Sequence, residues 1–339
     1  MLFVNLQLFA DISLNKTTDA NLSAEMKTYY DKDLLDNAEP ELVHRQFGQK
    51  RPLPKNNGKS IEFRSYSKLP KATQPLTEGV TPDGKNLTVT AITAEVAWYG
   101  DYVGITDALD LTGYDRNILE ANKLLGAQAG VTLDTITRNA INAGTNVMYQ
   151  AKEDGTAVTT RAGLTADCLL TIDTVFEAAA ILKAKNAPKI DGSYVAIIHP
   201  YVAKDFMIAN REAGSWSDVN TYSNATQIFE GEIGKVGGVR FVVSSEAKIW
   251  GAGKDGAPNG LAVFSTLVFG DGAYGVTDLE GGGLEMFVKQ LGSAGSADPL
   301  NQRATVGWKV STTSKILAEE FMVRIESTSS HSANIKESN

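Results

Sequence analysis

Cysteine and histidine are scarce in this 339-residue sequence, which contains one cysteine and three histidines. Cys168 alone cannot form an intramolecular disulfide, so a reducing cytosol is the expected compartment. His44, His199 and His331 lie far apart in the sequence and show no metal-ligand spacing. The sequence therefore predicts neither a disulfide-stabilised scaffold nor a metal centre.

Long apolar runs and an excess of positive charge are also missing. No stretch approaches the roughly 20 apolar residues that a membrane helix needs. The apolar residues 1–10 have no basic region before them and are interrupted by Asn5 and Gln7, so we interpret them as a packing segment rather than a signal peptide. The net charge of −8 gives no domain-wide basic face, and strong binding to nucleic acid through its phosphates is not expected.

What is present favours a globular protein with both helices and strands. Hydrophobic residues make up 42% of the chain, enough for one large domain or two modest ones. Residues 1–45 are predicted to form an arm, in which helical spacing begins at Leu22 and ends near Pro40. The arm carries more apolar residues than a disordered tail would.

Residues 50–110 are predicted to form a long two-stranded hairpin with a wide tip rich in proline and glycine. The aromatic residues of this excursion are Phe63, Tyr66, Trp98 and Tyr99. A hairpin on its own is only marginally stable in water, so these side chains need a surface to pack on. We expect that surface on another subunit. The alternative is that the hairpin folds back onto the long helix of its own chain.

The longest helix is predicted to begin after an Asp115 N-cap and to end at Gly144. Its apolar stripe consists of Ile118, Leu125, Ala129, Leu133, Ile136 and Ala140. A second helix is predicted after a Thr171 N-cap and ends before Pro188. The apolar run 194–198 then predicts a buried strand, and strands and turns dominate the rest of the chain.

Several short patterns resemble parts of catalytic or binding sites, and each has a simpler structural interpretation. The patterns are Asp107 with Asp110 as a carboxylate pair, Cys168 as a nucleophile, His199 as a cleft residue, Gly231 to Lys235 as a phosphate loop, Ser245 with Lys248 as a Ser-x-x-Lys pair, and Gly281 to Gly283 as a glycine-rich loop. The phosphate loop is too short, and Val236 stands where serine or threonine would bind magnesium. We therefore predict no catalytic, cofactor-binding or metal-binding residue and no enzymatic activity.

The order of parts resembles the major capsid fold of tailed bacteriophages, often called the Hong Kong ninety-seven type. Short segments along nearly the whole chain also resemble a major capsid family of phages and prophages named for an N-four-like phage. These segments are Leu6 to Ala10, Gln46 to Lys50, Leu69 to Thr73, Leu76 to Pro82, Tyr99 to Tyr102, Gly275 to Asp278 and Gly307 to Lys309. Each segment is weak evidence by itself, whereas their shared order is fairly specific.

The resemblance implies an α+β fold whose parts can be assigned along the chain. They would be an N-terminal arm at 1–45, an extended loop at 50–110, a peripheral domain with a long spine helix at 111–169, an axial α/β domain at 170–300, a return to the peripheral domain at 301–326, and a flexible tail at 327–339. The axial domain would meet its copies around five-fold and six-fold axes.

The resemblance also implies a function and partners. The chain would be a structural major capsid protein that assembles as pentamers and hexamers into an icosahedral head, in the cytoplasm of a bacterial host. Its partners would be copies of itself, a separate scaffolding protein, portal and head-completion proteins, and double-stranded DNA contacted without sequence preference; no membrane and no cofactor are expected. Two alternatives are an encapsulin-like compartment around an enzyme cargo and an unrecognised enzyme with a cleft where a carboxylate meets His199.

Overall fold

The computed structural model describes residues 43–339 with some gaps. Besides 1–42, the residues outside the description are 55, 57, 67–68, 77, 80, 82, 113–116, 211–216, 219–231, 280, 291 and 294–298. The arm predicted at 1–45 therefore lies almost wholly outside the described residues, and the Asp115 cap lies outside them too.

The chain divides into two compact units. In the described residues, unit 1 contains 100–129 and 284–309, and unit 2 contains 43–99, 130–283 and 310–339. Helix α3 (Asn117–Asn142) and strand β14 (Arg303–Ile316) contribute residues to both units.

A mixed sheet forms the centre of unit 2. Its strands, in spatial order, are β5 (Val147–Tyr149), β15 (Met322–Ser327), β11 (Val263–Phe269), β6 (Tyr194–Ile198), β9 (Val239–Val243), β8 (Glu232–Val236) and β7 (Ser217–Asp218), with β10 (Ile249–Trp250) paired to β11. The pairs β6–β9 and β5–β15 are parallel, and the others are antiparallel.

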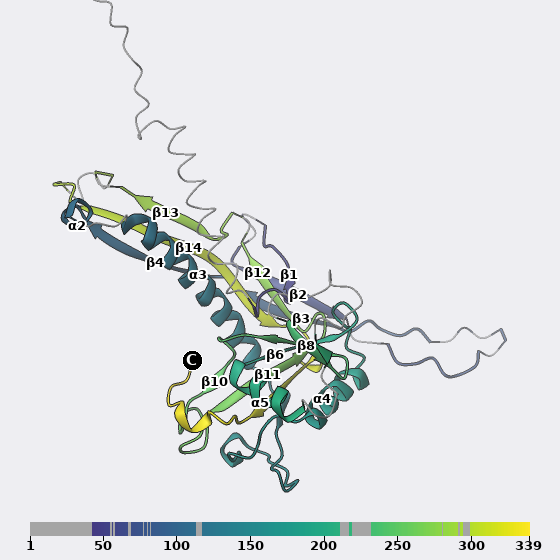
Figure 1. Ribbon diagram of the computed structural model, residues 1–339. Helices are drawn as coiled ribbons and strands as arrows, with labels where there is room; N and C mark the ends of the chain where they lie inside the picture. Colours follow the sequence, from purple (N-terminus) through teal and green to yellow (C-terminus); the bar gives the residue numbers. More distant parts are fainter. Residues whose placement is uncertain are drawn as a thin grey trace, which may run out of the picture. The chain divides into compact units, whose positions relative to one another are not determined.

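Both faces of this sheet are covered, which explains the continuous apolar run of β6. Helices α4 (Ile172–Ala184) and α5 (Pro200–Asn210) pack on the face that includes Ala196 and Ile198 (Figure 1). On the opposite face, Val195 and Ile197 belong to a cluster with Ile141 of α3. All five residues of β6 are buried as a result.

The predicted helix signals are confirmed where the structure describes them. The Thr171 side chain caps α4 by accepting a hydrogen bond from the Thr174 backbone N–H at 3.5 Å. The structure adds a helix start that was not predicted above: Pro200 is the first residue of α5, the position that suits its missing N–H. Along α3 the buried stripe runs through Leu125, Ala129 and Leu133 but continues to Ile141 instead of the predicted Ala140, which is only half-buried.

A second group of strands in unit 2 pairs with residues 49–53. Strand β12 (Tyr274–Asp278) pairs antiparallel with the last five residues of β14. Strand β1 (Gln49–Lys50) pairs in parallel with β12 on its other side. The same β12 edge continues to an isolated bridge between Leu53 and Leu279.

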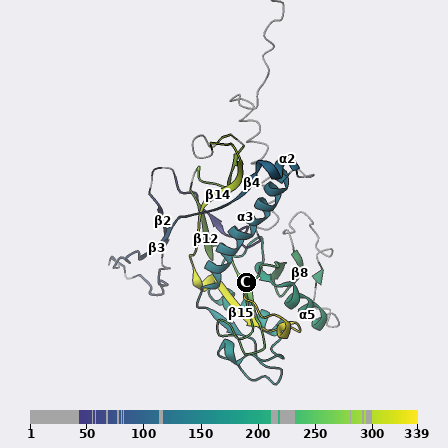
Figure 2. The same cartoon turned by 90° about the vertical axis from the view of Figure 1, so that its left-hand side faces the viewer.

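The hairpin consists of β2 (Ser60–Tyr66) and β3 (Val89–Glu95), which pair only with each other in the described sheets. The two strands run side by side away from β12 in both views (Figure 1 and Figure 2). The predicted hairpin at 50–110 was too long, because the ladder ends at the pair Ser60–Glu95 and the following residues form a separate strand.

That separate strand, β4 (Ala97–Thr106), pairs with β14 and continues into unit 1. Unit 1 also contains helix α2 (Asp107–Thr112) and strand β13 (Glu285–Lys289), which pairs with Thr305–Lys309 of β14. Its small buried cluster consists of Ile105, Ala121 and Ala304.

The predicted flexible tail at 327–339 is wrong, because these residues pack onto unit 2. Ser327 and Thr328 are fully buried, and a 3-10 turn at Ser332–Asn334 follows. The Asn339 side chain accepts a hydrogen bond from the Ile249 backbone N–H at 2.8 Å. The polar composition misled the prediction, since short polar side chains here bond to backbone groups that the sheet leaves unpaired. Two further 3-10 turns, Arg161–Gly163 and Glu319–Phe321, complete the described elements.

Candidate functional site

The short patterns that resembled catalytic sites are dispersed among structural elements. Asp107 begins α2, where its Oδ1 accepts a hydrogen bond from the Ala108 backbone N–H at 2.7 Å, and the side chain of Asp110 lies outside the described residues. Residues 232–236 form strand β8, so the pattern that resembled a phosphate loop does not form a loop there. Residues 245–248 lie in a turn, and Gly281 connects two strands with a positive φ of 76°.

Cys168 and His199 are both buried, and their contacts favour structural roles. The thiol of Cys168 lies 3.4 Å from both the backbone nitrogen and the hydroxyl of Thr165, within an apolar cluster. Nδ1 of His199 accepts a hydrogen bond from the Tyr201 backbone N–H at 3.2 Å, and the rings of Tyr201 and Phe264 lie 5.0 Å away. Burial lowers the pKa of His199 to about 4, so the ring is neutral near pH 7.

His44 forms a buried hydrogen-bonded pair with Asp134 that the sequence did not reveal. Its Nδ1 lies 2.5 Å from Oδ2 of Asp134 on α3, and its backbone N–H donates to Oδ1 of the same carboxylate at 2.6 Å. The Tyr274 hydroxyl donates to the His44 carbonyl oxygen, and burial raises the pKa of this tyrosine well above its usual value. Arg45 next in the chain pairs with Asp278 of β12. These contacts fix residues 44–45 to unit 2.

A second buried charge cluster holds the end of β15. The Glu326 carboxylate is fully buried and accepts hydrogen bonds from Arg161 at 2.7 Å and from Arg324 at 3.0 Å. Both guanidinium groups lie over the Trp250 ring, 3.6 Å and 5.5 Å from its centroid. The cluster joins the polar segment before α4 to the sheet, and we assign it a structural role.

In the described residues, no group of three histidine, cysteine or acidic side chains is arranged to hold a metal ion. No described helix is both long enough and apolar enough to cross a bilayer.

Large apolar side chains are exposed on both units. Strand β3 and the hairpin tip expose Leu69, Leu76, Leu87 and Val89. On unit 1 the exposed residues are Tyr102, Val103, Leu109, Leu124, Phe287 and Leu300. Where exposed apolar side chains adjoin one another, they mark interaction surfaces.

The aromatic residues of the predicted hairpin have different environments. Phe63 is only 4% exposed and packs within its own chain on Gly275 and Leu317, so it does not need another subunit for burial. A Cβ at Gly275 would lie 3.0 Å from the Phe63 ring, which shows how closely the ring approaches the β12 backbone. Trp98, on β4, is 50% exposed, and the side chain of Tyr66 lies outside the described residues.

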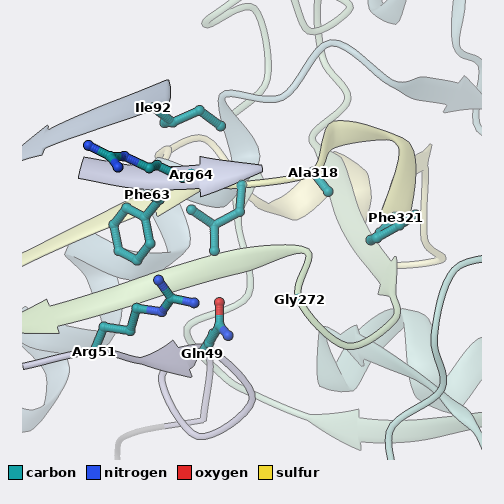
Figure 3. Close-up of a pocket in the computed structure, with 9 residues that line it drawn as sticks. Gln49, Arg51, Phe63, Arg64, Ile92, Gly272, Ala318 and Phe321 are labelled. Atoms are coloured by element: carbon teal, nitrogen blue, oxygen red, sulfur yellow. The ribbon is translucent and has the colours of Figure 1, made fainter. Parts of the chain in front are cut away.

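A cavity of about 150 Å³ lies at the base of the hairpin, where β2 and β3 meet β1 and the segment after β14. It is lined by Gln49, Arg51, Phe63, Arg64, Ile92, Gly272, Leu317, Ala318 and Phe321. Gln49 and Arg51 face Phe63 across it (Figure 3). The Arg51 guanidinium lies 5.7 Å from the centroid of the Phe63 ring. The lining therefore places the Arg51 guanidinium against an apolar wall, whereas the Arg64 side chain lies on the opposite side of β2 from Phe63 (Figure 3).

The chain is similar to known phage capsid proteins in sequence and in fold. A family model described as phage capsid protein matches residues 89–325. A capsid structure of Ralstonia phage GP4 has a TM-score of 0.64 at 13% identity and covers 84% of this chain and 87% of its own. Capsid structures of cyanophages P-SCSP1u and Pam1 both have TM-scores of 0.60, at 19% and 16% identity, and cover 84% and 85% of this chain and 87% and 93% of their own. No curated protein sequence matches the chain.

Proposed function

The chain belongs to the phage capsid protein family and is a structural capsid protein with the α+β fold of tailed-phage heads. From this premise we propose that its copies assemble as pentamers and hexamers into an icosahedral head around double-stranded DNA. The single observation that carries the proposal is the projecting hairpin, whose apolar residues at its tip and on β3 are exposed in one copy. A compartment around an enzyme cargo is not favoured, because the matching family and capsid structures are those of phages.

The hairpin supports assembly because its exposed side chains lack a surface in the single subunit. Leu76 is 77% exposed and Leu87 is 66% exposed. Burying a large apolar side chain contributes roughly 1.5–3 kcal/mol. A neighbouring copy supplies the surface, and contacts of this head-to-tail kind close only through rotational symmetry. We assign assembly to the whole exposed part of the hairpin, while Phe63 anchors its base to its own subunit.

The domain assignment remains part of this proposal. Residues 111–169 and 301–326 would form the peripheral domain, and 170–300 the axial domain that surrounds the symmetry axes. The arm at 1–45 and the loop at 50–110 would contact neighbouring copies. The protein would act without catalysis or cofactor, since its buried charges and its histidines have structural contacts.

The proposed partners follow from the same function. A scaffolding protein would direct assembly in the host cytoplasm, and portal and head-completion proteins would occupy one vertex. Packaged DNA would be held by confinement, because a chain with a net charge of −8 offers the interior little net attraction for phosphates. Nanomolar, sequence-selective binding of DNA by the isolated subunit near physiological salt would contradict this point.

The test shortens the hairpin tip and measures both folding and assembly. Replacing residues 71–86 by a tight Asn-Gly turn removes the exposed tip and leaves the β2–β3 ladder intact. We expect a soluble subunit with a nearly unchanged thermal transition and few or no shells by sedimentation and electron microscopy. A variant that assembles as well as the parent, or that unfolds, would show that the tip has no assembly role. A parent that stays a monomer under all conditions would overturn the proposed function.

A further inference from the structure

The C-terminal segment, residues 329–339, closes one edge of the sheet in unit 2. In the described sheets β10 pairs with β11 alone, so the other edge of β10 presents backbone N–H groups. Three N–H groups at this edge donate to the segment: Ile249 to Oδ1 of Asn339 at 2.8 Å, Gly251 to Oγ of Ser338 at 2.9 Å, and Ala252 to the Ile335 carbonyl oxygen at 3.3 Å. The segment therefore occupies hydrogen bonds that an edge strand otherwise offers to another chain.

A single carboxylate on α5 fixes the start of this segment. Asp205 accepts hydrogen bonds from the Ser330 backbone N–H and hydroxyl, both at 2.7 Å, and from the Ser329 hydroxyl at 2.9 Å. Burial acts to raise the pKa of Asp205, but these hydrogen bonds outweigh burial, so the pKa lies below its ordinary value and the carboxylate is ionised at neutral pH. The ammonium group of Lys204 lies 3.2 Å from Nε2 of His331. The segment is thus held at α5 before it reaches β10.

Apolar packing contributes little to holding residues 329–339 in place. Ile335 is their only large apolar side chain, and it is only partly buried against the core of unit 2. Of the other residues in the segment, only Ser329 and Ser332 are buried. A segment that is held mainly by hydrogen bonds near the surface opens locally at a lower free-energy cost than a strand in the middle of the core.

We propose that residues 329–339 act as an autoinhibitory strap, which keeps the β10 edge of an unassembled subunit from pairing with an extended segment of a second copy of the chain. The Asp205 carboxylate keeps the strap closed. A released strap leaves the edge N–H groups beside Trp250 without their acceptors, and such an edge is a template for strand pairing between chains. The partner is a second copy because a capsid protein accumulates as many copies of one chain.

Hydrogen exchange and sedimentation of the full-length, unassembled subunit test the strap. Asp205→Ala removes the acceptor of three hydrogen bonds, and we expect the amides of Ile249, Gly251 and Ala252 to exchange at least tenfold faster than in the parent. At higher protein concentration the variant should associate into species other than shells, and the same amides should become protected again. Glu177→Ala, which removes an exposed carboxylate from α4, should exchange and sediment like the parent.

A second variant loosens the strap from its other end. In Gly251→Ala the added Cβ would lie 2.5 Å from the Lys336 carbonyl oxygen, so exchange at Ile249 and association should increase as in Asp205→Ala. If Asp205→Ala does not fold, Gly251→Ala alone decides. The inference is overturned if the edge amides keep parent-like protection, if an exposed edge leaves the subunit monomeric at every concentration, or if Glu177→Ala behaves like Asp205→Ala. Because these measurements use the unassembled subunit, absence of shells from the parent would count against the proposed function and not against the strap.

Discussion

The imidazole Nδ1 of His44 lies 2.5 Å from Oδ2 of Asp134, and neither side chain is accessible to solvent. The pair connects the start of the described chain to a helix that lies 90 residues further along the sequence. A buried hydrogen-bonding group that loses its partner is costly, because no water is present to replace the interaction.

Removing the carboxylate should therefore destabilise the subunit. Asp134→Ala leaves the His44 imidazole and its backbone N–H without their acceptor, and we expect the free energy of unfolding to fall by about 1–3 kcal/mol for each of the two buried groups left unsatisfied. Urea unfolding of the unassembled subunit measures it. Glu177→Ala, which removes an exposed carboxylate from α4, should change stability by less than about 0.5 kcal/mol. Equal effects of the two substitutions would show that the buried pair contributes no more to the free energy of unfolding than an exposed carboxylate does.

His199 should make the subunit less stable in acid. Burial lowers its pKa from 6.5 to about 4, so between these values the unfolded chain binds more protons than the folded one. Stability is then highest above pH 6.5 and falls as the pH decreases toward 4, by up to about 3 kcal/mol from this group. His199→Gln should flatten the dependence measured by urea unfolding at several pH values. If the parent and His199→Gln gave parallel curves of stability against pH, His199 would not be the group that destabilises the subunit in acid.

The Glu326 carboxylate should be needed to hold two guanidinium groups together over Trp250. Glu326→Gln leaves Arg161 and Arg324 close to each other without a counter-charge. We therefore expect the free energy of unfolding to fall by about 3–5 kcal/mol. Glu320→Gln is the matched control, because its pair with Lys185 is exposed and long at 4.0 Å. Thermal unfolding of both variants gives the comparison. If Glu320→Gln lowered stability as much as Glu326→Gln, burial would not explain the contribution of Glu326.

The packed C-terminal segment can be tested at a glycine beneath it. A Cβ at Gly251 would lie 2.5 Å from the Lys336 carbonyl oxygen, so Gly251→Ala must displace residues 335–338. We expect the free energy of unfolding to fall by about 1–3 kcal/mol and proteolysis after residue 327 to become faster. Gly283→Ala should behave like the parent, because no atom lies within 4 Å of its added methyl group. Unchanged proteolysis in Gly251→Ala would show that this segment is held loosely.

Local signals in the sequence predicted most elements of the fold correctly. The Thr171 cap and the apolar run of β6 depend on residues close to one another in the chain. The tail at 327–339 was mispredicted because its polar side chains gain partners only when the edge at Ile249 is in place. Such partners lie far away in the sequence and leave no periodic signal.

The candidate site was less predictable than the fold. The sequence indicated a hairpin with exposed aromatic residues, but Phe63 is buried because Gly275, more than 200 residues later, leaves room for its ring. The cavity at the hairpin base combines residues from five separate segments, so no local motif could reveal it. The buried pair of His44 and Asp134 escaped prediction for the same reason.

The complete enclosure of β6 between two layers has a consequence for synthesis of the protein in a cell. The apolar runs of β6, β9 and β11 are soluble only once the layers close over them. The parallel pairing of β6 with β9 must wait until α5 and the following residues have left the ribosome. Until then each run is a short, uncharged or weakly charged β-forming segment of the kind that aggregates. Newly made chains should therefore depend on chaperones, and lower growth temperature should raise the soluble yield more than a change in promoter strength.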